Sequence, residues 1–344
     1  MKLTRALVGA ALLFALAGCS SNEDPLQPPV IPPAANSWEP THVGLTVTGI
    51  WGSSGSDVFA VGAAGTILHY DGSAWSEMNS GTGEYLSRVW GSSGSDVFAV
   101  GYGGTILHYD GNGWSKMASG TTMDLFGVFG SSGSDVFAVG GGGTILHYNG
   151  SAWNLMRSGT TEYLWGVWVS WECDVYAVGS YGTILHYDGS VWSEMISPTT
   201  RYFVAVWGSS GSDVFEVGWA MIRHYDGSVW SEMASVPGTY LLSVWGSSGS
   251  DVFAVGWDGA ILHYDGTDWS PMESEPPANL ECVWGSSAQD VFAAGRSGAI
   301  LHYDGSAWSA MSSGTPIDIY CVWGSSAKDV YAAGKGGTIL HYGP

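Results

Sequence analysis

The sequence predicts an all-β fold, an eight-bladed β-propeller of four-stranded antiparallel blades, on three observations. A segment of the type Val-Trp-Gly-Ser-Ser-Gly-Ser-Asp-Val-Phe-Ala-Val-Gly recurs eight times, with a period of 39 residues that shortens once to 38. Each copy contains four short apolar stretches separated by glycine-rich turns. The last copy lacks its fourth stretch, and a matching tryptophan segment precedes the first copy. The lead aromatic residues are Trp51, Trp90, Phe129, Trp168, Trp207, Trp245, Trp284 and Trp323.

The second copy illustrates the four strands, which we call a, b, c and d. Strand a ends at Trp90, strand b covers residues 96–101, strand c covers residues 105–109, and strand d begins at Trp114. Gly-Ser-Ser-Gly-Ser, Gly-x-x-Gly and Asp-Gly-Ser lie between them, as short hairpin loops require. Strands b and c are apolar on both faces, so each sheet must lie between two others. Radial stacking of small sheets satisfies this requirement.

The two ends of the repeat array predict how the ring closes. Eight third strands end in His-Tyr, the last at His341, after which only three residues remain. The first strand-d tryptophan, Trp38, precedes any strand a. We therefore expect the Trp38 segment to supply the missing fourth strand of the last blade and to close a ring of eight blades.

The N-terminus has the pattern of an export signal over residues 1–18. A cationic start is followed by an apolar run, residues 6–17, that is too short to cross a hydrocarbon core of about 30 Å. Leu16-Ala17-Gly18-Cys19 resembles a bacterial lipobox, which implies lipidation of Cys19. Ser20 then favours anchoring to the outer membrane or cell surface; an ordinary signal peptide is the alternative. Residues 19–37 form a proline-rich tether, and the propeller covers residues 38–344.

Charge and cysteine content restrict the partners. The net charge of −21 repels phosphate backbones and anionic lipids, so we expect no nucleic-acid partner and no membrane contact besides the lipid anchor. Three cysteines beyond Cys19 do not form a disulfide framework. We expect a monomer.

The run Val-Gly-x-x-Gly-Thr-Ile-Leu-x-x-x-Asp-Gly…Trp resembles the repeats of Asp-box (BNR-like) and photosystem-assembly-factor propellers, with fainter kelch-like features. The resemblance covers residues 38–343 and implies the fold. It implies little about activity, because such families include sialidases, assembly factors and adhesins. The chain departs from the Asp-box because Asp71 and Trp75 are one residue closer together.

Two repeated residue types were candidates for metal binding. One histidine per blade spreads the imidazoles too widely for a shared ion, so we predict packing and hydrogen bonding, with no metal and no cofactor. We expect the aspartate that opens each strand b, such as Asp57, to accept N–H groups of the Ser-Ser-Gly turn. Calcium at these loops is the alternative, without an Asp-x-Asp-x-Asp-Gly spacing to support it.

The arginines do not form the cluster that a sialidase needs for its substrate carboxylate. Only five lie beyond the signal peptide, at Arg88, Arg157, Arg201, Arg223 and Arg296, and no carboxylate pair stands out. We predict no catalytic residues.

The residues that break the repeat predict a binding site. Trp165, Trp219 and Trp257 occupy b–c turns or the start of strand a in three consecutive blades, which places them at one end of the propeller. Exposed aromatic side chains with polar neighbours are typical of binding surfaces. Drift in weakly constrained loops is the alternative. The same predicted sector includes Tyr181, Arg201 and Asp258.

Blade five has charged residues where the other blades have alanine and leucine. Glu216 and Arg223 flank a shortened b–c turn, so we predict a structural ion pair across the ladder. An arginine that contacts ligand beside Trp219 is the alternative.

The leading interpretation is a surface-anchored, non-catalytic module that binds a glycan or a protein through one propeller face. An assembly or scaffolding factor for an envelope protein complex is the second hypothesis, and an Asp-box glycoside hydrolase is the third.

Overall fold

The computed structural model describes residues 37–170, 174–274 and 277–343. The predicted signal peptide, Cys19 and the tether up to residue 36 lie outside the described residues. The propeller begins with β1 (Trp38–His42). No helix in the described part of the chain is long and apolar enough to cross a membrane.

The four strands recur at the predicted places in the repeat. The a strands are β2 (Val47–Ser54), β6 (Leu86–Ser93), β10 (Leu125–Ser132), β14 (Leu164–Val169), β18 (Phe203–Ser210), β24 (Leu280–Ser287) and β28 (Ile319–Ser326). The b strands are β3 (Asp57–Gly62), β7 (Asp96–Gly101), β11 (Asp135–Gly140), β15 (Val175–Gly179), β21 (Asp251–Gly256), β25 (Asp290–Gly295) and β29 (Asp329–Gly334). The c strands are β4 (Ile67–Tyr70), β8 (Ile106–Tyr109), β12 (Ile145–Tyr148), β16 (Ile184–Tyr187), β22 (Ile261–Tyr264), β26 (Ile300–Tyr303) and β30 (Thr338–Tyr342).

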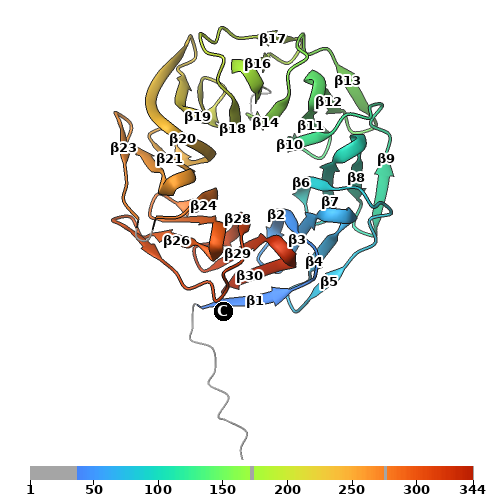
Figure 1. The fold of residues 1–344 in the computed structure, drawn as a ribbon. Coiled ribbons are helices and arrows are strands. Elements are labelled where there is room, and N and C mark those ends of the chain that lie inside the picture. The colour runs from blue at the N-terminus through green and yellow to red at the C-terminus, as the bar shows by residue number, and fades with distance from the viewer. Residues whose placement is uncertain (1–36, 171–173, 275–276, 344) are drawn as a thin grey trace, which may run out of the picture. The chain divides into compact units, whose positions relative to one another are not determined.

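The d strands are shorter and lie at the rim. They are β5 (Trp75–Glu77), β9 (Trp114–Met117), β13 (Trp153–Met156), β17 (Trp192–Glu194), β23 (Trp269–Pro271) and β27 (Trp308–Ala310). Most b–c turns are single 3₁₀ turns, η1 (Ala63–Gly65), η2 (Tyr102–Gly104), η3 (Gly141–Gly143), η4 (Ser180–Gly182), η5 (Trp257–Gly259), η6 (Arg296–Gly298) and η7 (Lys335–Gly337). Figure 1 shows the a strands around a central opening and the d strands outermost.

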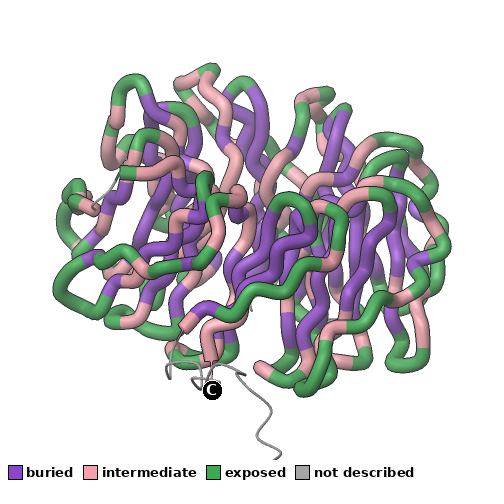
Figure 2. The backbone as a smooth tube through the Cα atoms, turned by 60° about the horizontal axis from the view of Figure 1, so that its bottom comes forward, coloured by how far each residue is buried: buried purple, intermediate pink, exposed green. Residues whose placement is uncertain are grey.

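The strands are antiparallel and the core lies between neighbouring sheets. Val58, Phe59 and Val61 of β3 have no exposed surface, and the equivalent residues of the other b strands are similarly buried. Figure 2 shows the buried segments in the middle of the sheets and the exposed segments in the loops. This packing follows from strands that are apolar on both faces.

The number of separate sheets differs from the prediction. The described residues form seven sheets, not eight, because the fifth and sixth repeats share one six-stranded sheet. In it, β19 (Asp213–Tyr225) covers strands b and c of the fifth repeat, and β20 (Trp230–Ser248) runs on from strand d into strand a of the sixth. The b–c turn of this repeat is one residue short, and Trp219 pairs with Tyr240. The ladder therefore continues through the d–a connection that separates sheets elsewhere.

The last sheet takes its fourth strand from the N-terminal end of the propeller. β1 pairs with β30 along its whole length, from Trp38 opposite Tyr342 to His42 opposite Thr338. Trp38 is buried and packs against Phe292 of the preceding sheet.

A Ser–Asp–His network recurs at the end of the sheets that carries the a–b loops. In the first repeat, His69 Nε2 lies 2.7 Å from Asp57 Oδ1, and Ser53 Oγ donates to Asp57 Oδ2. The His–Asp contact is present in all eight repeats at 2.5–3.1 Å. Each imidazole also packs against the aromatic residue of strand b, and seven of the eight pairs are stacked, as His69 is on Phe59. These histidines are structural, as predicted from their spacing.

The predicted hydrogen-bond donors to the aspartate that opens strand b were wrong. Asp57 binds a hydroxyl and an imidazole rather than the N–H groups of the Ser-Ser-Gly turn. The backbone N–H groups are bound instead by the aspartate of the c–d turn: Asp71 Oδ1 accepts from the N–H groups of Ser73 and Ala74. The Ser73 hydroxyl and these N–H groups lower the pKa of Asp71 to about 2. An Asx turn therefore explains the repeated Asp-Gly-Ser.

One pair of substitutions preserves packing between neighbouring blades. A β-carbon added at Gly130 would lie 2.8 Å from the Trp90 ring of the preceding repeat. In the next repeat this glycine is replaced by Val169, which packs against Phe129, the one lead aromatic residue that is not tryptophan. The smaller ring leaves the space that the valine side chain fills.

Candidate binding face around the central channel

Each a strand contains a β-bulge at the same place. The register shifts between Val47 and Gly49 in β2 and at the equivalent position in the other seven repeats. A bulge leaves its extra residue outside the ladder and redirects its side chain. The bulged residues are Thr48, Ser87, Phe126, Trp165, Val204, Leu242, Glu281 and Tyr320.

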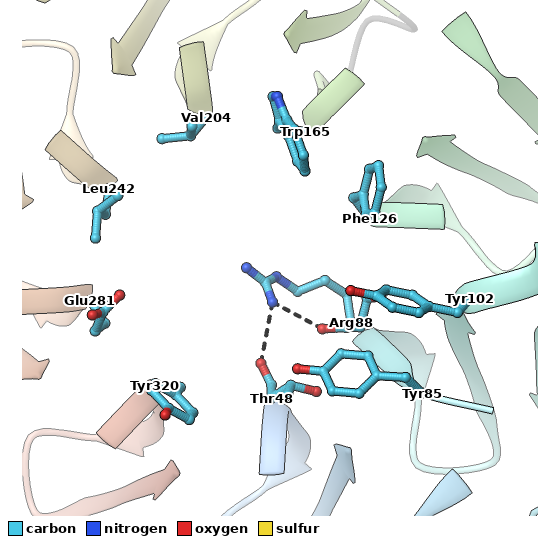
Figure 3. A pocket seen from close by; sticks show the side chains of 11 residues that line it. Thr48, Tyr85, Arg88, Tyr102, Phe126, Trp165, Val204, Leu242, Glu281 and Tyr320 are labelled. Carbon is cyan, nitrogen blue, oxygen red and sulfur yellow. Dashed lines mark hydrogen bonds between the residues drawn. The ribbon is translucent and has the colours of Figure 1, made fainter. Parts of the chain in front are cut away.

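The eight bulged residues surround one cavity, which we call the channel mouth. Together with Tyr85, Arg88 and Tyr102 they line a volume of about 410 Å³ (Figure 3). The lining is mixed, with aromatic, aliphatic, hydroxyl and charged side chains. A volume of this size accommodates a small ligand or the end of a peptide.

A second cavity of about 310 Å³ shares this lining and extends to the next residues of the a strands. At that next position seven repeats carry small residues, and the second carries Arg88. The seven are Gly49, Gly127, Gly166, Ala205, Ser243, Cys282 and Cys321. The small residues leave the interior of the channel open, so the Arg88 side chain has room to extend from one wall.

Arg88 is held in the mouth by two backbone carbonyls. Its Nη1 donates to the carbonyl oxygens of Ser87, at 2.9 Å, and Thr48, at 3.3 Å. Burial raises the pKa of the Cys321 thiol to about 12, and the positive charge of Arg88 partly offsets this by lowering the same pKa. Among the described residues, no carboxylate lies within 4 Å of this guanidinium.

Aromatic residues form one wall of the mouth. The rings of Phe126 and Trp165 stack at 4.6 Å, and Tyr163 stacks on Trp165 at 5.6 Å. The Trp165 Nε1 donates to Ser180 Oγ at 3.1 Å, which fixes the indole orientation. Tyr85 and Tyr102 pack together at 4.8 Å beside them.

Trp219 and Trp257 lie in the b–c turns of the fifth and sixth repeats and are joined by Tyr240. Trp219 stacks on Tyr240 at 5.4 Å with an interplanar angle of 9°, and Tyr240 contacts Trp257 at 4.9 Å. We call these three residues the aromatic shelf. Arg296 lies over the Trp257 ring at 5.5 Å, and its Nε is 2.8 Å from Oε1 of Glu281. The shelf is therefore connected to the channel mouth through two charged side chains.

The other predicted site residues have more local roles. Tyr181 is 59% exposed and packs against Tyr202. Arg201 donates from Nη1 to the Ala220 carbonyl at 3.0 Å, which ties the d–a connection to the next b–c turn. The N–H of Asp258 donates to Asn279 Oδ1 at 2.8 Å, and Asp258 has a positive φ of 57°. No contact joins Asp258 to Tyr181 or Arg201 in the described part of the chain.

Glu216 and Arg223 lie opposite each other inside the fifth blade. Arg223 Nη1 is 3.3 Å from Glu216 Oε1, and both side chains are almost fully buried. Arg223 also donates to Ser197 Oγ and to the Trp230 carbonyl. Burial raises the pKa of Glu216 well above its usual value, and Arg223 acts in the opposite direction. The two side chains thus form the ion pair across the blade that the sequence predicts.

Several residues of the face were not predicted, although the repeats contain a signal for them. The residue five before the lead aromatic is polar in four repeats, where its side chain accepts an N–H of the neighbouring b–c turn, as Asp124 does from Gly103 at 2.8 Å. In the other four repeats this residue is Tyr85, Tyr163, Tyr202 or Tyr240. Together with the bulged residues, these tyrosines make one end of the propeller differ between repeats whose strands are nearly identical.

No cluster of three or more His, Cys, Asp or Glu side chains that could bind a metal occurs in residues 37–170, 174–274 and 277–343. The titratable groups of the channel mouth come from three repeats and form no arrangement of nucleophile and base. Tyr85, Arg88 and Tyr102 belong to the second repeat, Glu281 to the seventh and Tyr320 to the eighth.

No protein-family model matches the chain, and no curated protein does. Solved structures do match it over most of its length. YCF48 bound to D1 peptide is 16% identical, with 90% of this chain and 96% of that chain covered and a TM-score of 0.60. The computationally designed Ika8 protein is 15% identical, with 88% and 98% covered and a TM-score of 0.76. Chaetomium thermophilum Sqt1 bound to the N-terminus of the ribosomal protein L10 is 12% identical, with 87% and 97% covered and a TM-score of 0.70. At these identities the likeness shows the β-propeller fold alone.

Proposed function

We propose that this chain is a non-catalytic binding module that recognises a protein partner through the channel mouth and the aromatic shelf. The observation that carries the proposal is where the repeats differ. Strands b and c are almost unchanged from repeat to repeat, whereas the bulged residues and turns at one end are of eight different kinds. Packing alone does not require this variety, since each blade has the same neighbours.

The composition of this end favours a protein over a glycan. Seven of the large apolar side chains that are exposed lie in its turns and connections, at Leu45, Tyr102, Met123, Tyr163, Tyr181, Ile196 and Trp219. Tyrosine, tryptophan, methionine and arginine are enriched in protein interfaces. Two proteins with similar folds, YCF48 and Sqt1, were solved with a bound peptide and a bound protein N-terminus. An assembly or scaffolding role is one form of this function.

The probe is a peptide selected from a display library on the purified protein. The variants Trp219→Ala and Tyr240→Ala are each expected to bind this peptide about 10- to 100-fold more weakly. The reason is loss of an exposed, pre-stacked aromatic surface. Affinity is measured by calorimetry, and the thermal unfolding midpoint checks that each variant is folded. Val229→Ala and Val191→Ala, in exposed c–d turns at the rim, are the matched controls. Equal affinities for all four variants would show that another surface binds. If a glycan array gives binders and the peptide library gives none, the ligand is a glycan and not a protein.

We also propose that the module is displayed at the envelope surface through lipidated Cys19. The expected result is an N-terminal peptide of the mature protein that begins at Cys19 and carries the mass of a diacylglyceryl group. Mass spectrometry of the protein extracted from membranes measures it. An unmodified cysteine, or an N-terminus elsewhere, would rule out the anchor.

The binding face needs a ring in which all eight repeats keep their places around the mouth. We propose that the pairing of β1 with β30 keeps this ring closed, which the Trp38 variant described in the Discussion tests.

A further inference from the structure

Arg88 is the cation of the channel mouth, and its position is specific to one repeat. Seven of the eight residues at this level are glycine, alanine, serine or cysteine. The chain has 10 basic against 31 acidic residues, so an arginine that extends into the central channel is not part of a general basic surface. Figure 3 shows its guanidinium reaching from one wall towards the middle of the mouth.

The hydrogen bonds of Arg88 leave one edge of the guanidinium free. Both carbonyls, of Ser87 and of Thr48, accept from Nη1. In the described residues, Nε and Nη2 have no hydrogen-bond acceptor and no carboxylate within 4 Å. Two parallel N–H groups on one edge match the two oxygens of a carboxylate. The carbonyls thus hold the side chain in place without using this edge.

A buried hydroxyl beside Arg88 also has no partner. Ser87 lines the channel mouth, is 6% exposed, and its Oγ makes no hydrogen bond in the part of the chain that the structure describes. A buried hydroxyl without a partner costs free energy unless something else supplies the bond. A ligand oxygen in the mouth would supply it.

The acid that lines the channel mouth does not occupy this edge. Glu281 lines the opposite side of the mouth, and its Oε1 is bound by Arg296, which is held in turn against Trp257. The wall next to Arg88 is aromatic, with Tyr85, Tyr102 and Phe126. A ligand that fits between the Arg88 guanidinium and this aromatic wall has one negatively charged end and an apolar body.

We propose that the channel mouth is a carboxylate-binding site that takes an acid group at the end of an apolar or aromatic segment, with the Nε and Nη2 edge of Arg88 as its counter-ion. This inference rests on the proposed function and names the part of the ligand that enters the mouth. A doubly charged group such as phosphate fits less well, because the site offers one guanidinium and one hydroxyl within a strongly acidic protein. The carboxylate belongs either to the C-terminus of a partner chain or to a small organic acid.

The test compares acids with their amides on the purified protein by calorimetry. The small-molecule probes are 3-phenylpropionate and 3-phenylpropionamide, and the peptide probes are Ala-Ala-Leu-Phe with a free or an amidated C-terminus. Each acid is expected to bind about 10-fold or more tightly than its amide, since a charge-assisted pair replaces a neutral one. Tighter binding of the peptide acid than of phenylpropionate identifies a chain terminus, and the reverse order identifies a small acid.

The variants isolate the guanidinium. Arg88→Gly places the residue of three other repeats at this position, so the fold tolerates it, and it is expected to reduce acid binding to the level of the amide. Arg88→Lys keeps the charge but loses the paired N–H edge, so an intermediate affinity is expected. Arg157→Ala removes an exposed arginine outside the mouth and places the residue of the second repeat there, so it is the matched control.

Equal binding of acid and amide, an unchanged affinity in Arg88→Gly, or no binding of any acid at about 20 mM would overturn the carboxylate site. The proposed function fails separately. If selected peptides lose affinity in the shelf variants but not in Arg88→Gly, the binding face stands and the carboxylate site falls. If the small acid binds through Arg88 but no peptide binds the face, the carboxylate site stands and the protein-binding function falls.

Discussion

Trp38→Ala is expected to lower the free energy of unfolding by about 3–5 kcal/mol, the usual cost of truncating a buried tryptophan. Trp38 is 5% exposed and contacts Phe292 and Tyr342. Among the described residues, it also belongs to the one fourth strand that no turn connects to its neighbour, because β1 and β30 come from opposite ends of the propeller. Loss of the indole should therefore release the whole strand. Urea denaturation measures the loss, and faster hydrogen exchange of the β30 amides reports release of the strand.

Trp153→Ala is the matched control for this prediction. Trp153 has the same place in the third repeat, is 7% exposed, and makes equivalent contacts with Phe98 and Tyr148. A four-residue turn keeps its strand next to β12 even when the side chain is lost. The Trp38 variant should therefore be less stable than the Trp153 variant by about 1 kcal/mol or more, because loop closure has to be supplied by the pairing itself. Equal losses, with β30 still protected, would show that β1 does not hold the ring closed.

Arg223→Leu is expected to destabilise the protein by about 3–5 kcal/mol, because it leaves Glu216 buried without a counter-charge. Glu216 has no exposed surface, and its Oε2 has no partner within the described residues. Glu216→Ala combined with Arg223→Leu gives the pair found in the other repeats, such as Ala60 opposite Leu68. The double variant is expected to be as stable as the wild type or more so, since hydrophobic residues replace buried ion pairs at little cost. Urea denaturation of the two single variants and the double variant measures the coupling; additive losses would contradict a direct interaction.

The same pair gives the Arg223→Leu variant a pH dependence of known sign. Burial raises the pKa of Glu216 in the folded state above its value in the unfolded chain. The folded state then binds more protons between these two values, so stability is greatest below the unfolded pKa and is lost as the pH rises towards the folded one. Removing Arg223 takes away the interaction that lowers this pKa. The destabilisation by Arg223→Leu should therefore grow as the pH rises from the unfolded pKa of Glu216 towards its folded one. A loss that is constant over this range would show that Glu216 does not change its protonation.

Residues with strictly local roles were the most predictable part of the fold. The strands follow from the alternation of apolar residues with glycine-rich turns, and all eight copies of the repeat predict the same four strands. The histidines were correctly assigned to packing, because their spacing alone separates them. The aspartates of strand b were assigned the wrong donors, since the sequence does not show that His69, twelve residues further on, lies closer than the adjacent turn.

The candidate site was only partly predictable. Trp165, Trp219 and Trp257 stood out because they break the repeat, but nothing in the residue pattern placed Tyr240 between two of them. Arg88 was considered only as a member of a missing arginine cluster. Its role in the mouth depends on the small residues across the channel, which come from repeats far away in the chain.

The sequence by itself determined the repeat, its four strands and turns, and the packing of sheet against sheet, because these depend on residue patterns within 39 positions. Only the tertiary structure decided which side chains meet. The bulge that turns Thr48, Trp165 and Glu281 towards one cavity is a property of paired backbones, and it leaves no distinctive residue type in the sequence. The shared sheet of the fifth and sixth repeats was likewise decided by the tertiary structure. The sequence shows the shortened b–c turn, but the pairing of Trp219 with Tyr240 depends on how both backbones lie together.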